Sequence, residues 1–238
     1  IRLLKGLTNN KQMVTLNYYT KDNIIKEENI YPRKYYNLEE GKKLLSDYTL
    51  SVLGYGSQGR AQALNLRDSD CNVILGLRKD GTSWNKAVND GFVPNKTLFE
   101  IDEAVNKGSI IMNLLSDAGQ MKTYDILKDN LKEGDSLYFS HGFNVVYSDL
   151  TKFNISDLPD IDVIMVAPKG SGQTVRSKFL ENKGINSSFA VYKDFSGKAL
   201  DKALSIGFLI GSPYMYETTF SNEVFSDLTG ERSILMGG

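Results

Sequence analysis

A glycine-rich turn between two regular segments constrains the fold of this chain more than any other feature. Residues 50–53 predict a short buried strand, and Gly54, Gly56 and Gly59 follow with the spacing G-x-G-x-x-G before a helix predicted over residues 61–66. In such a turn the first glycine permits a tight bend, the second lets the backbone approach a pyrophosphate, and the third brings helix and strand together. Glycine spacing alone is a weak signal, but the flanking strand and helix supply the required context. The turn therefore predicts a dinucleotide-binding site.

Short apolar runs alternate with predicted helices over most of the chain. Strands are predicted at residues 50–53, 72–77, 109–115, 135–140, 161–167 and 188–192, and helices at 37–47, 61–66, 83–90, 98–107, 118–130 and after Gly172. This alternation is typical of an α/β fold with a parallel sheet covered on both faces. After residue 194 two helices, 199–210 and 220–236, follow with no predicted strand between them. We therefore predict an N-terminal arm (1–36), a Rossmann-like NADP-binding domain (37–194) and the beginning of an all-helical domain (195–238).

The composition is that of a soluble globular protein and excludes several kinds of partner. Apolar residues make up 41% of the 238 residues, charged residues make up 24%, and the net charge is −1. The chain therefore shows no electrostatic footprint for nucleic acid or an anionic membrane. No apolar run approaches the ~20 residues that span a bilayer. The single cysteine, Cys71, excludes an internal disulfide and suits a reducing compartment.

The expected location is the bacterial cytoplasm, with a mitochondrial or plastid matrix as the alternative. Residues 1–21 contain Arg2, Lys5, Lys11 and Lys21 and no acidic residue. Such a start is typical of the remnant of an organelle transit peptide, but the stretch has few serines and no strong amphipathic period. We therefore predict a simple N-terminal arm.

The loop after the second predicted strand indicates which dinucleotide is bound. NAD-binding proteins usually have Asp or Glu there, about 20 residues past the glycines, to hold the ribose 2′-hydroxyl. Here the position is Arg78, followed by Lys79 and Ser83, with Asp80 as a discordant charge. A guanidinium suits a 2′-phosphate because it forms charge-assisted pairs. The loop therefore favours NADP over NAD, although a solvated turn is also compatible with it.

Three further stretches lie at the predicted carboxyl ends of strands, where open α/β sheets bind ligands. Small residues after residue 115 allow a cofactor to approach, or simply begin a helix capped by Ser116 or Asp117. His141, the one histidine of the chain, follows the strand at 135–140, and this position favours proton transfer over a structural role. Lys169 follows the next strand, either to orient an anionic substrate or as a surface lysine.

Two carboxylates near the end of the chain are candidate metal ligands. Asp227 and Glu231 are four residues apart, so a helix places both on one face. Two oxygen ligands on one face suit Mg²⁺, which keeps several of its waters. Charges at this spacing more often lie on a solvated face, so the spacing by itself is weak evidence.

Seven ordered stretches carry a more specific signal. They are the glycine turn at 54–59, Asn65-Leu-Arg-Asp68, Gly76-Leu-Arg78 with Ser83-Trp84, Ser140-His-Gly-Phe-Asn144, Val166-Ala-Pro-Lys-Gly170, Gly184-Ile-Asn-Ser-Ser188, and Glu217-Thr-Thr-Phe220 with Ser226-Asp-Leu-Thr-Gly-Glu231. Together they resemble the ketol-acid reductoisomerase (acetohydroxyacid isomeroreductase) family from about residue 48 onward. The loop after Arg78 is similar to the fungal mitochondrial and Bacteroidetes-type branches, in which an Asp at position 80 is compatible with NADP.

The resemblance implies an activity and a set of site residues. The family converts 2-acetolactate, or 2-aceto-2-hydroxybutyrate, to a 2,3-dihydroxy acid in branched-chain amino acid biosynthesis, by Mg²⁺-assisted alkyl migration followed by hydride transfer from NADPH. It implies His141 and Lys169 as catalytic residues, and Asp227 and Glu231 as metal ligands, with two ions in the full-length enzyme. The implied cofactor contacts are Gly54, Tyr55, Gly56, Ser57, Gln58, Gly59, Arg78, Ser83, Asp117, Ala118, Gly119, Gln120 and Gly172.

The chain also departs from the family. Ser171 and Gln173 stand where many members have Pro and His, and the family continues as a helical, knotted domain that supplies further Glu ligands and a Ser. We therefore expect these residues alone to bind NADPH but to turn over substrate poorly or not at all. We also expect homo-oligomers or aggregation through apolar faces at Leu204, Phe208, Leu209 and Ile210. The alternatives are a truncated non-catalytic NADP-binding module, or another NADP-dependent hydroxyacid dehydrogenase that needs no metal.

Overall fold

A computed structural model describes residues 18–21 and 33–236, with side chains described for residues 37–228. The strands are β1 (Tyr18–Lys21), β2 (Arg33–Tyr36), β3 (Leu50–Leu53), β4 (Val73–Gly76), β5 (Leu98–Phe99), β6 (Ile110–Asn113), β7 (Ser136–Phe139), β8 (Asp162–Pro168), β9 (Ser187–Lys193) and β10 (Tyr214–Glu217). The helices are α1 (Leu38–Leu45), α2 (Ser57–Asp68), α3 (Thr82–Asn89), α4 (Ile101–Lys107), α5 (Asp117–Lys122), α6 (Tyr124–Asn130), α7 (Phe143–Val146), α8 (Ser148–Thr151), the 3₁₀ turn η1 (Ile155–Asp157), α9 (Gly172–Leu180), α10 (Ala199–Leu209) and α11 (Phe220–Met236).

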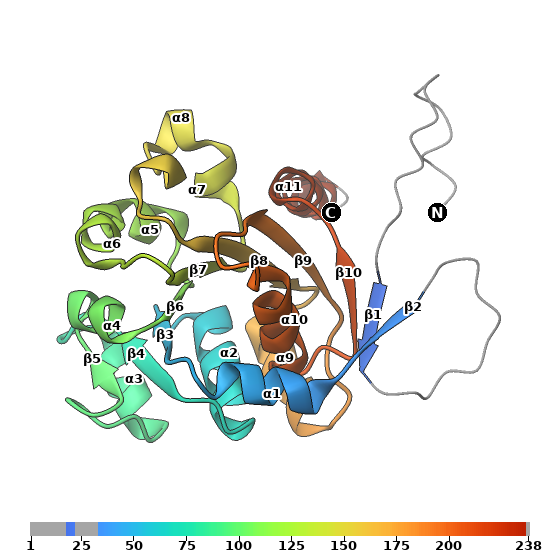
Figure 1. Cartoon of the computed structure of the whole chain (residues 1–238), viewed down its shortest axis with the longest axis horizontal. Coiled ribbons are helices and arrows are strands. Elements are labelled where there is room, and N and C mark those ends of the chain that lie inside the picture. Colours follow the sequence, from blue (N-terminus) through green and yellow to red (C-terminus); the bar gives the residue numbers. More distant parts are fainter. Residues whose placement is uncertain (1–17, 22–32, 237–238) are drawn as a thin grey trace.

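The described strands form a single sheet in the order β2-β1-β10-β9-β8-β7-β6-β3-β4-β5 (Figure 1). The six strands from β5 to β8 are all parallel, and the order of strand addition reverses between β3 and β6. This is the strand order of a Rossmann-type dinucleotide-binding sheet, which binds ligands where the order reverses. The α/β prediction is therefore confirmed. The sheet is mostly rather than wholly parallel, because β9 is antiparallel to β8 and β1 is antiparallel to β10.

Two apolar cores cover the two faces of the sheet. One contains residues of α1, α2, α3 and α10, and the other contains residues of α4, α6, α7 and α11. The strands β3, β4 and β6 to β8 are buried over nearly their whole length. Continuous burial explains why these strands read as apolar runs rather than as alternating patterns. Both layers leave the carboxyl ends of the central strands open for a site.

Several predicted elements have the boundaries that their local chemistry sets. The predicted first helix begins where Asn37 caps it, since its Oδ1 accepts the N–H groups of Glu39 at 3.1 Å and Glu40 at 3.4 Å. The helix predicted over 98–107 is wrong at its start, because residues 98–99 pair with β4 as strand β5. The helix predicted over 118–130 is two helices, α5 and α6, which meet at Thr123.

The structure corrects the sequence analysis most in residues 199–217. A strand, β10, lies between α10 and α11 and pairs with β9, whereas none was predicted there. Leu204, Phe208, Leu209 and Ile210 are each at most 2% exposed, so they belong to the core and do not form the apolar face that we expected for association. The boundary near residue 195 stays a prediction.

The N-terminal arm falls mostly outside the described residues, which include only β1 and β2 from it. The question of a transit peptide in residues 1–21 lies outside them for the same reason, apart from the four residues of β1. In residues 18–21 and 33–236, no helix combines the length and the apolar character that a bilayer crossing requires.

Candidate cofactor and active site

The glycine turn connects β3 to α2 and has the geometry that its spacing predicts. Gly54 has a φ of +90°, which favours glycine. A Cβ on Gly59 would lie 2.3 Å from the Gly54 carbonyl oxygen, so only glycine lets the helix approach the strand this closely. For Gly56, by contrast, no described atom lies within 4 Å of a built Cβ. The second glycine therefore faces open space at the N-terminus of α2, where a phosphate would approach the backbone.

A second helix N-terminus meets the turn. A Cβ on Gly172, the first residue of α9, would lie 2.0 Å from the Ser57 carbonyl oxygen, so α2 and α9 begin in direct contact. Together they border a cavity of about 210 Å³, the helix-terminus cavity, which is also lined by Arg60, Lys86 and Arg176. Two helix N-termini and Lys86 make this cavity attractive to an anion, while Arg60 and Arg176 are each paired with a carboxylate, Asp90 and Asp68 respectively.

Arg78 and Ser83 lie together, as the sequence predicts for residues that recognise a 2′-phosphate. They line a cavity of about 300 Å³, the β3–β4 cavity, with Gly54, Tyr55 and Gly56. Arg78 also lines an adjoining cavity of about 260 Å³, the α5 cavity, with Ala118, Gly119 and Lys122. Shared residues connect these cavities across the carboxyl ends of β3, β4 and β6.

Tyr55, which we predicted to contact the cofactor, has its hydroxyl engaged elsewhere. It donates to Asp90 Oδ2 at 2.9 Å, while Arg60 forms a bidentate pair with the same carboxylate at 2.7 and 2.8 Å. Burial and the bond to Asp90 raise the pKa of Tyr55, and the hydrogen bond from Arg60 holds the pKa of Asp90 below its usual value. Sequence analysis missed Asp90 because its partners are 30 and 35 residues away.

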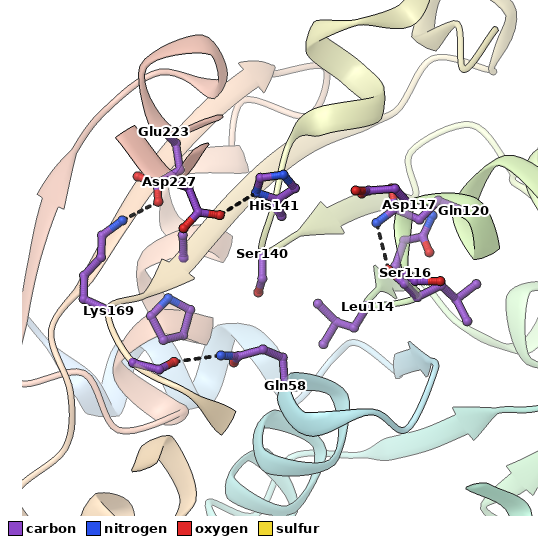
Figure 2. A pocket seen from close by; sticks show the side chains of 15 residues that line it. Gln58, Leu114, Ser116, Asp117, Gln120, Ser140, His141, Lys169, Glu223 and Asp227 are labelled. Atoms are coloured by element: carbon purple, nitrogen blue, oxygen red, sulfur yellow. Dashed lines mark hydrogen bonds and ion pairs between the residues drawn. The ribbon is translucent and has the colours of Figure 1, made fainter. Parts of the chain in front are cut away.

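A cavity of about 700 Å³, called the central cavity here, lies at the ends of β6, β7 and β8 (Figure 2). Gln58, Asp117, Gln120, His141, Lys169 and Asp227, all predicted site residues, line it. Figure 2 shows His141, Lys169 and Asp227 on one side of the cavity and Asp117 and Gln120 on the other. The cavity also shares Leu114, Leu115 and Ser116 with the β3–β4 cavity. A long ligand can therefore extend from Arg78 to His141.

His141 is held at the rim of the central cavity by α11 and α7. Its Nδ1 lies 3.1 Å from Asp227 Oδ2, and its ring is stacked parallel to that of Phe143 at an interplanar angle of 7°. The imidazole is 29% exposed and the carboxylate 52% exposed, so both remain accessible from the cavity. An accessible imidazole oriented by a carboxylate is suited to proton transfer.

Lys169 is paired with Glu223, which the sequence analysis missed. Glu223 is nearly buried; one carboxylate oxygen accepts a hydrogen bond from the Lys169 ammonium, and the other accepts from Ser188 Oγ at 2.6 Å. Glu223 lies four residues before Asp227 on α11, the same spacing that separates Asp227 from Glu231. This spacing is the signal by which Glu223 could have been found in the sequence. Glu223 thus fixes the Lys169 ammonium at the cavity wall, although the two residues are 54 positions apart in the sequence.

A buried hydrogen-bond network supports the floor of the central cavity. Tyr138 donates to Gln62 Oε1 at 2.8 Å, Gln62 Nε2 donates to Ser140 Oγ at 2.9 Å, and Ser140 donates to the Val166 carbonyl at 2.9 Å. Burial raises the pKa of Tyr138, so it stays protonated as a donor. Gln58 Nε2 donates to the Gly170 carbonyl at 2.9 Å and joins the glycine turn to the Lys169 loop. The network fixes α2 against β7 and β8.

The metal ligands predicted on α11 are only partly described. In the part of the chain with described side chains, no group of three or more His, Cys, Asp or Glu is arranged to hold a metal ion. Asp227 faces the central cavity and presents an accessible carboxylate, whereas the side chain of Glu231 lies outside the described ones. One accessible oxygen ligand at the cavity is compatible with Mg²⁺, which keeps waters in its remaining positions.

The strand order, the glycine turn and the connected cavities define this chain as a Rossmann-type nicotinamide dinucleotide-binding protein. Residues 44–215 match the family described as "Acetohydroxy acid isomeroreductase, NADPH-binding domain". The chain therefore belongs to the ketol-acid reductoisomerase family.

Relatives with established names agree with this family. The chain is 54% identical over 212 residues to the mitochondrial ketol-acid reductoisomerase of Neurospora crassa, covering 89% of this chain and 52% of that protein. It is 52% identical over 211 residues to the NAD(+) ketol-acid reductoisomerase of Desulfosudis oleivorans, covering 89% and 59%. A solved NADH-preferring ketol-acid reductoisomerase from an uncultured archaeon has a TM-score of 0.75 and 39% identity, covering 83% of this chain and 59% of that one. The chain thus spans between half and three fifths of the length of these relatives.

Proposed function

We propose that this chain forms the cofactor-binding part of a ketol-acid reductoisomerase that uses NADPH. The observation that carries the proposal is the continuous set of cavities from Arg78 to His141, bordered by the glycine turn. In this proposal Arg78 and Ser83 hold the 2′-phosphate, and the N-termini of α2 and α9 hold the pyrophosphate. The remaining predicted contacts, Gln58, Asp117, Ala118, Gly119 and Gln120, border the cavities along the same path.

The proposed substrate is a 2-acetolactate-type ketol acid bound in the central cavity. Lys169 supplies a positive charge for the substrate carboxylate, and Glu223 fixes the position of that charge. His141, oriented by Asp227, moves a proton to or from a substrate oxygen. The overall change consumes one NADPH and one proton and yields the 2,3-dihydroxy acid and NADP⁺.

We further propose that Asp227 and Glu231 hold Mg²⁺. The accessible carboxylate of Asp227 at the central cavity supports this proposal, together with the helical i, i+4 spacing of the pair. When bound, the metal supplies Lewis-acid polarisation of the ketol oxygens. A ketol-acid reductoisomerase needs this metal for catalysis and would lose activity in EDTA. A hydroxyacid dehydrogenase, the alternative from the sequence, needs no metal and would retain activity in EDTA.

The domain boundary, the oligomeric state and the compartment are proposals as well. We retain a helical second part but infer that it begins after β10, because α10 and β10 complete the sheet and its core. A homo-oligomer formed through that helical part remains our expectation. The fungal relatives are named mitochondrial, which supports the organelle alternative over the bacterial cytoplasm.

Calorimetric titration of NADPH and of NADH into this chain, with and without Mg²⁺, tests the cofactor proposal. We expect NADPH to bind at least tenfold more tightly than NADH, because a charge-assisted pair with the 2′-phosphate contributes about 1.5–3 kcal/mol. Arg78→Ala should remove most of that preference and leave NADH binding nearly unchanged. Lys79→Ala, the neighbouring cation that borders neither cavity described for Arg78, is the matched control.

Relatives named for NAD(+) and for NADP(+) both occur, so the titration decides between two cofactor preferences known among them. One relative is named for NAD(+) and another for NADP(+) at 44% identity. Equal affinity for NADPH and NADH, or a preference that survives Arg78→Ala, would contradict the proposed role of this arginine. Failure of both nucleotides to bind would contradict the proposed function itself.

A further inference from the structure

The amide of Asn113 is buried in the wall of the central cavity with neither of its polar atoms paired. Asn113 is the last residue of β6, is 1% exposed and lines the cavity. Both Nδ2 and Oδ1 are without a hydrogen-bond partner among the residues that the structure describes. Buried polar side chains are nearly always paired, so an unpaired amide in a cavity wall points to a ligand. Less than 1 Å² of either polar atom is exposed, so Asn113 meets that ligand by turning its side chain into the cavity.

The other buried amides near this loop donate hydrogen bonds that hold it in place, although Asn144 Oδ1 is also unpaired among the described residues and, unlike Asn113, does not line the central cavity. Asn144 Nδ2 donates to the Asp117 carbonyl at 3.1 Å and to Gln120 Oε1 at 3.0 Å. Gln120 Nε2 in turn donates to the Leu115 carbonyl at 3.1 Å. These bonds fix the loop that follows β6 and leave Asn113 with its full hydrogen-bonding capacity, one acceptor and two N–H donors.

The position of Asn113 in the sheet places it between the two ends of the proposed cofactor path. It is in register with Leu53, the residue before the glycine turn, on the neighbouring strand β3. On its other side, β6 pairs with β7, whose carboxyl end leads to His141. Asn113 therefore lies past the phosphate-binding turn, in the same cavity as the proposed proton carrier.

We propose that Asn113 binds the carboxamide group of the nicotinamide ring, an inference that rests on the proposed binding of NADPH. The Asn113 Oδ1 accepts from the carboxamide N–H, and its Nδ2 donates to the carboxamide oxygen. Two primary amides are complementary in this way, and the pair satisfies both open positions of the side chain. The contact fixes the rotation of the ring and hence the face it turns toward the substrate.

Titration with an analogue that lacks the carboxamide N–H tests this assignment in the full chain. Reduced 3-acetylpyridine adenine dinucleotide phosphate keeps the carbonyl oxygen but has a methyl group in place of the amine. We expect the unmodified chain to bind NADPH roughly tenfold more tightly than the analogue, the effect of one lost hydrogen bond in a buried site. Asn113→Leu removes both bonds, so the ratio of the two affinities should fall to about one.

Ser51→Ala is the matched control, because Ser51 Oγ is also buried and unpaired among the described residues but does not line the central cavity. It should leave the ratio unchanged. Asn113→Leu should fold at least as well as the unmodified chain, since an apolar side chain of similar shape replaces an unpaired amide. Thermal unfolding of each variant checks this point.

The outcomes separate the two proposals. Absence of NADPH binding by the unmodified chain would overturn the proposed function and this inference with it. NADPH binding with a ratio that Asn113→Leu does not change would overturn the inference alone. Equal weakening of both ligands would also overturn it, because the contact would then involve a group that they share, such as the ribose. A ratio near one in the unmodified chain overturns it without any variant.

Discussion

At the scale of single residues, the glycine turn offers the sharpest test, because Gly56 and Gly59 have opposite surroundings. A methyl group on Gly59 would meet the Gly54 carbonyl oxygen at 2.3 Å, whereas one on Gly56 would meet no described atom within 4 Å. We expect Gly59→Ala to lower the free energy of unfolding by about 1–3 kcal/mol through overpacking, and to weaken NADPH binding as a result. Thermal unfolding and calorimetry measure the two effects.

Gly56→Ala is the complementary variant. Gly56 has a φ of −72°, which alanine adopts without strain, so the unfolding temperature should stay unchanged. The added methyl group occupies the space where the backbone would approach the pyrophosphate, so NADPH affinity should fall about tenfold or more. Unchanged affinity in Gly56→Ala would show that the pyrophosphate does not approach this turn.

Candidate site residues could be named from the sequence, but the contacts between them and with other residues could not. His141 and Lys169 follow apolar runs at predicted strand ends, and parallel strands bring such positions to one edge. Their partners lie on α11, and the network below connects Tyr138 to Gln62 over 76 residues. Nothing in local periodicity specifies a pair over such distances. Asn113 was missed because it lies within the strand predicted over 109–115, where it counts as one more buried position, whereas the observed strand β6 ends at it.

At the scale of elements, a buried ion pair attaches α10 to the sheet at the end opposite the site. Lys202 Nζ lies 2.7 Å from Asp162 Oδ2 and 2.9 Å from Ser136 Oγ, and both charged side chains are at most 1% exposed. Removing one partner of a buried pair leaves the other charge uncompensated. We therefore expect Lys202→Met to lower the free energy of unfolding by about 3–5 kcal/mol, measured by urea denaturation at pH 7.

The same pair predicts how stability changes with pH. Burial alone would raise the pKa of Asp162, but hydrogen bonds from Lys202 and Ser196 outweigh it and hold the pKa below its usual value. Because the folded pKa lies below the unfolded value of about 3.9, the stabilisation is complete above that value and is lost as the pH falls through the folded pKa. The stability difference between the unmodified chain and Asp162→Asn should therefore be largest at neutral pH and shrink below about pH 4.

Asp135 supplies a control of opposite sign. It is buried nearby and accepts the Lys132 N–H at 2.8 Å, a bond that Asn can still accept. Burial raises the pKa of Asp135, so its charge opposes folding at neutral pH. Asp135→Asn should be as stable as the unmodified chain or more so at pH 7, with the gain disappearing in acid. Parallel pH profiles for the two variants would contradict the assigned roles.

The elements that sequence analysis missed are short or depend on distant pairing. β5 has only two residues, and Glu100 alone separates it from the helix α4. In the sequence, its two apolar residues therefore look like the first turn of that helix. β10 has the sequence Tyr-Met-Tyr-Glu, with only Met215 buried, and lacks the apolar run of a central strand. β9 is antiparallel to β8 although the helix α9 connects the two strands, and apolar runs alone do not specify this direction.

At the scale of the whole molecule, the position of α10 predicts that residues on both sides of position 195 unfold together. Leu204, on α10, is 1% exposed and belongs to the same core as β3, α2 and α3. Trp84, the one tryptophan of the chain, packs against this core from α3. We expect Leu204→Ala to lower the free energy of unfolding by about 2–5 kcal/mol. Trp84 fluorescence and far-ultraviolet circular dichroism should report the same shifted transition.

Leu200→Ala separates this effect from a general weakening of the helix, because Leu200 lies on α10 but is 38% exposed. It loses less buried surface and should change stability by less than about 1 kcal/mol. An independent domain beginning at residue 195 makes a different prediction: Leu204→Ala would then shift the dichroism transition and leave the Trp84 transition in place. A common shift instead means that the cofactor-binding unit extends through β10, because its core is incomplete without α10. The buried face of α10 then serves to complete that unit, and the homo-oligomer that we propose would have to form through another surface.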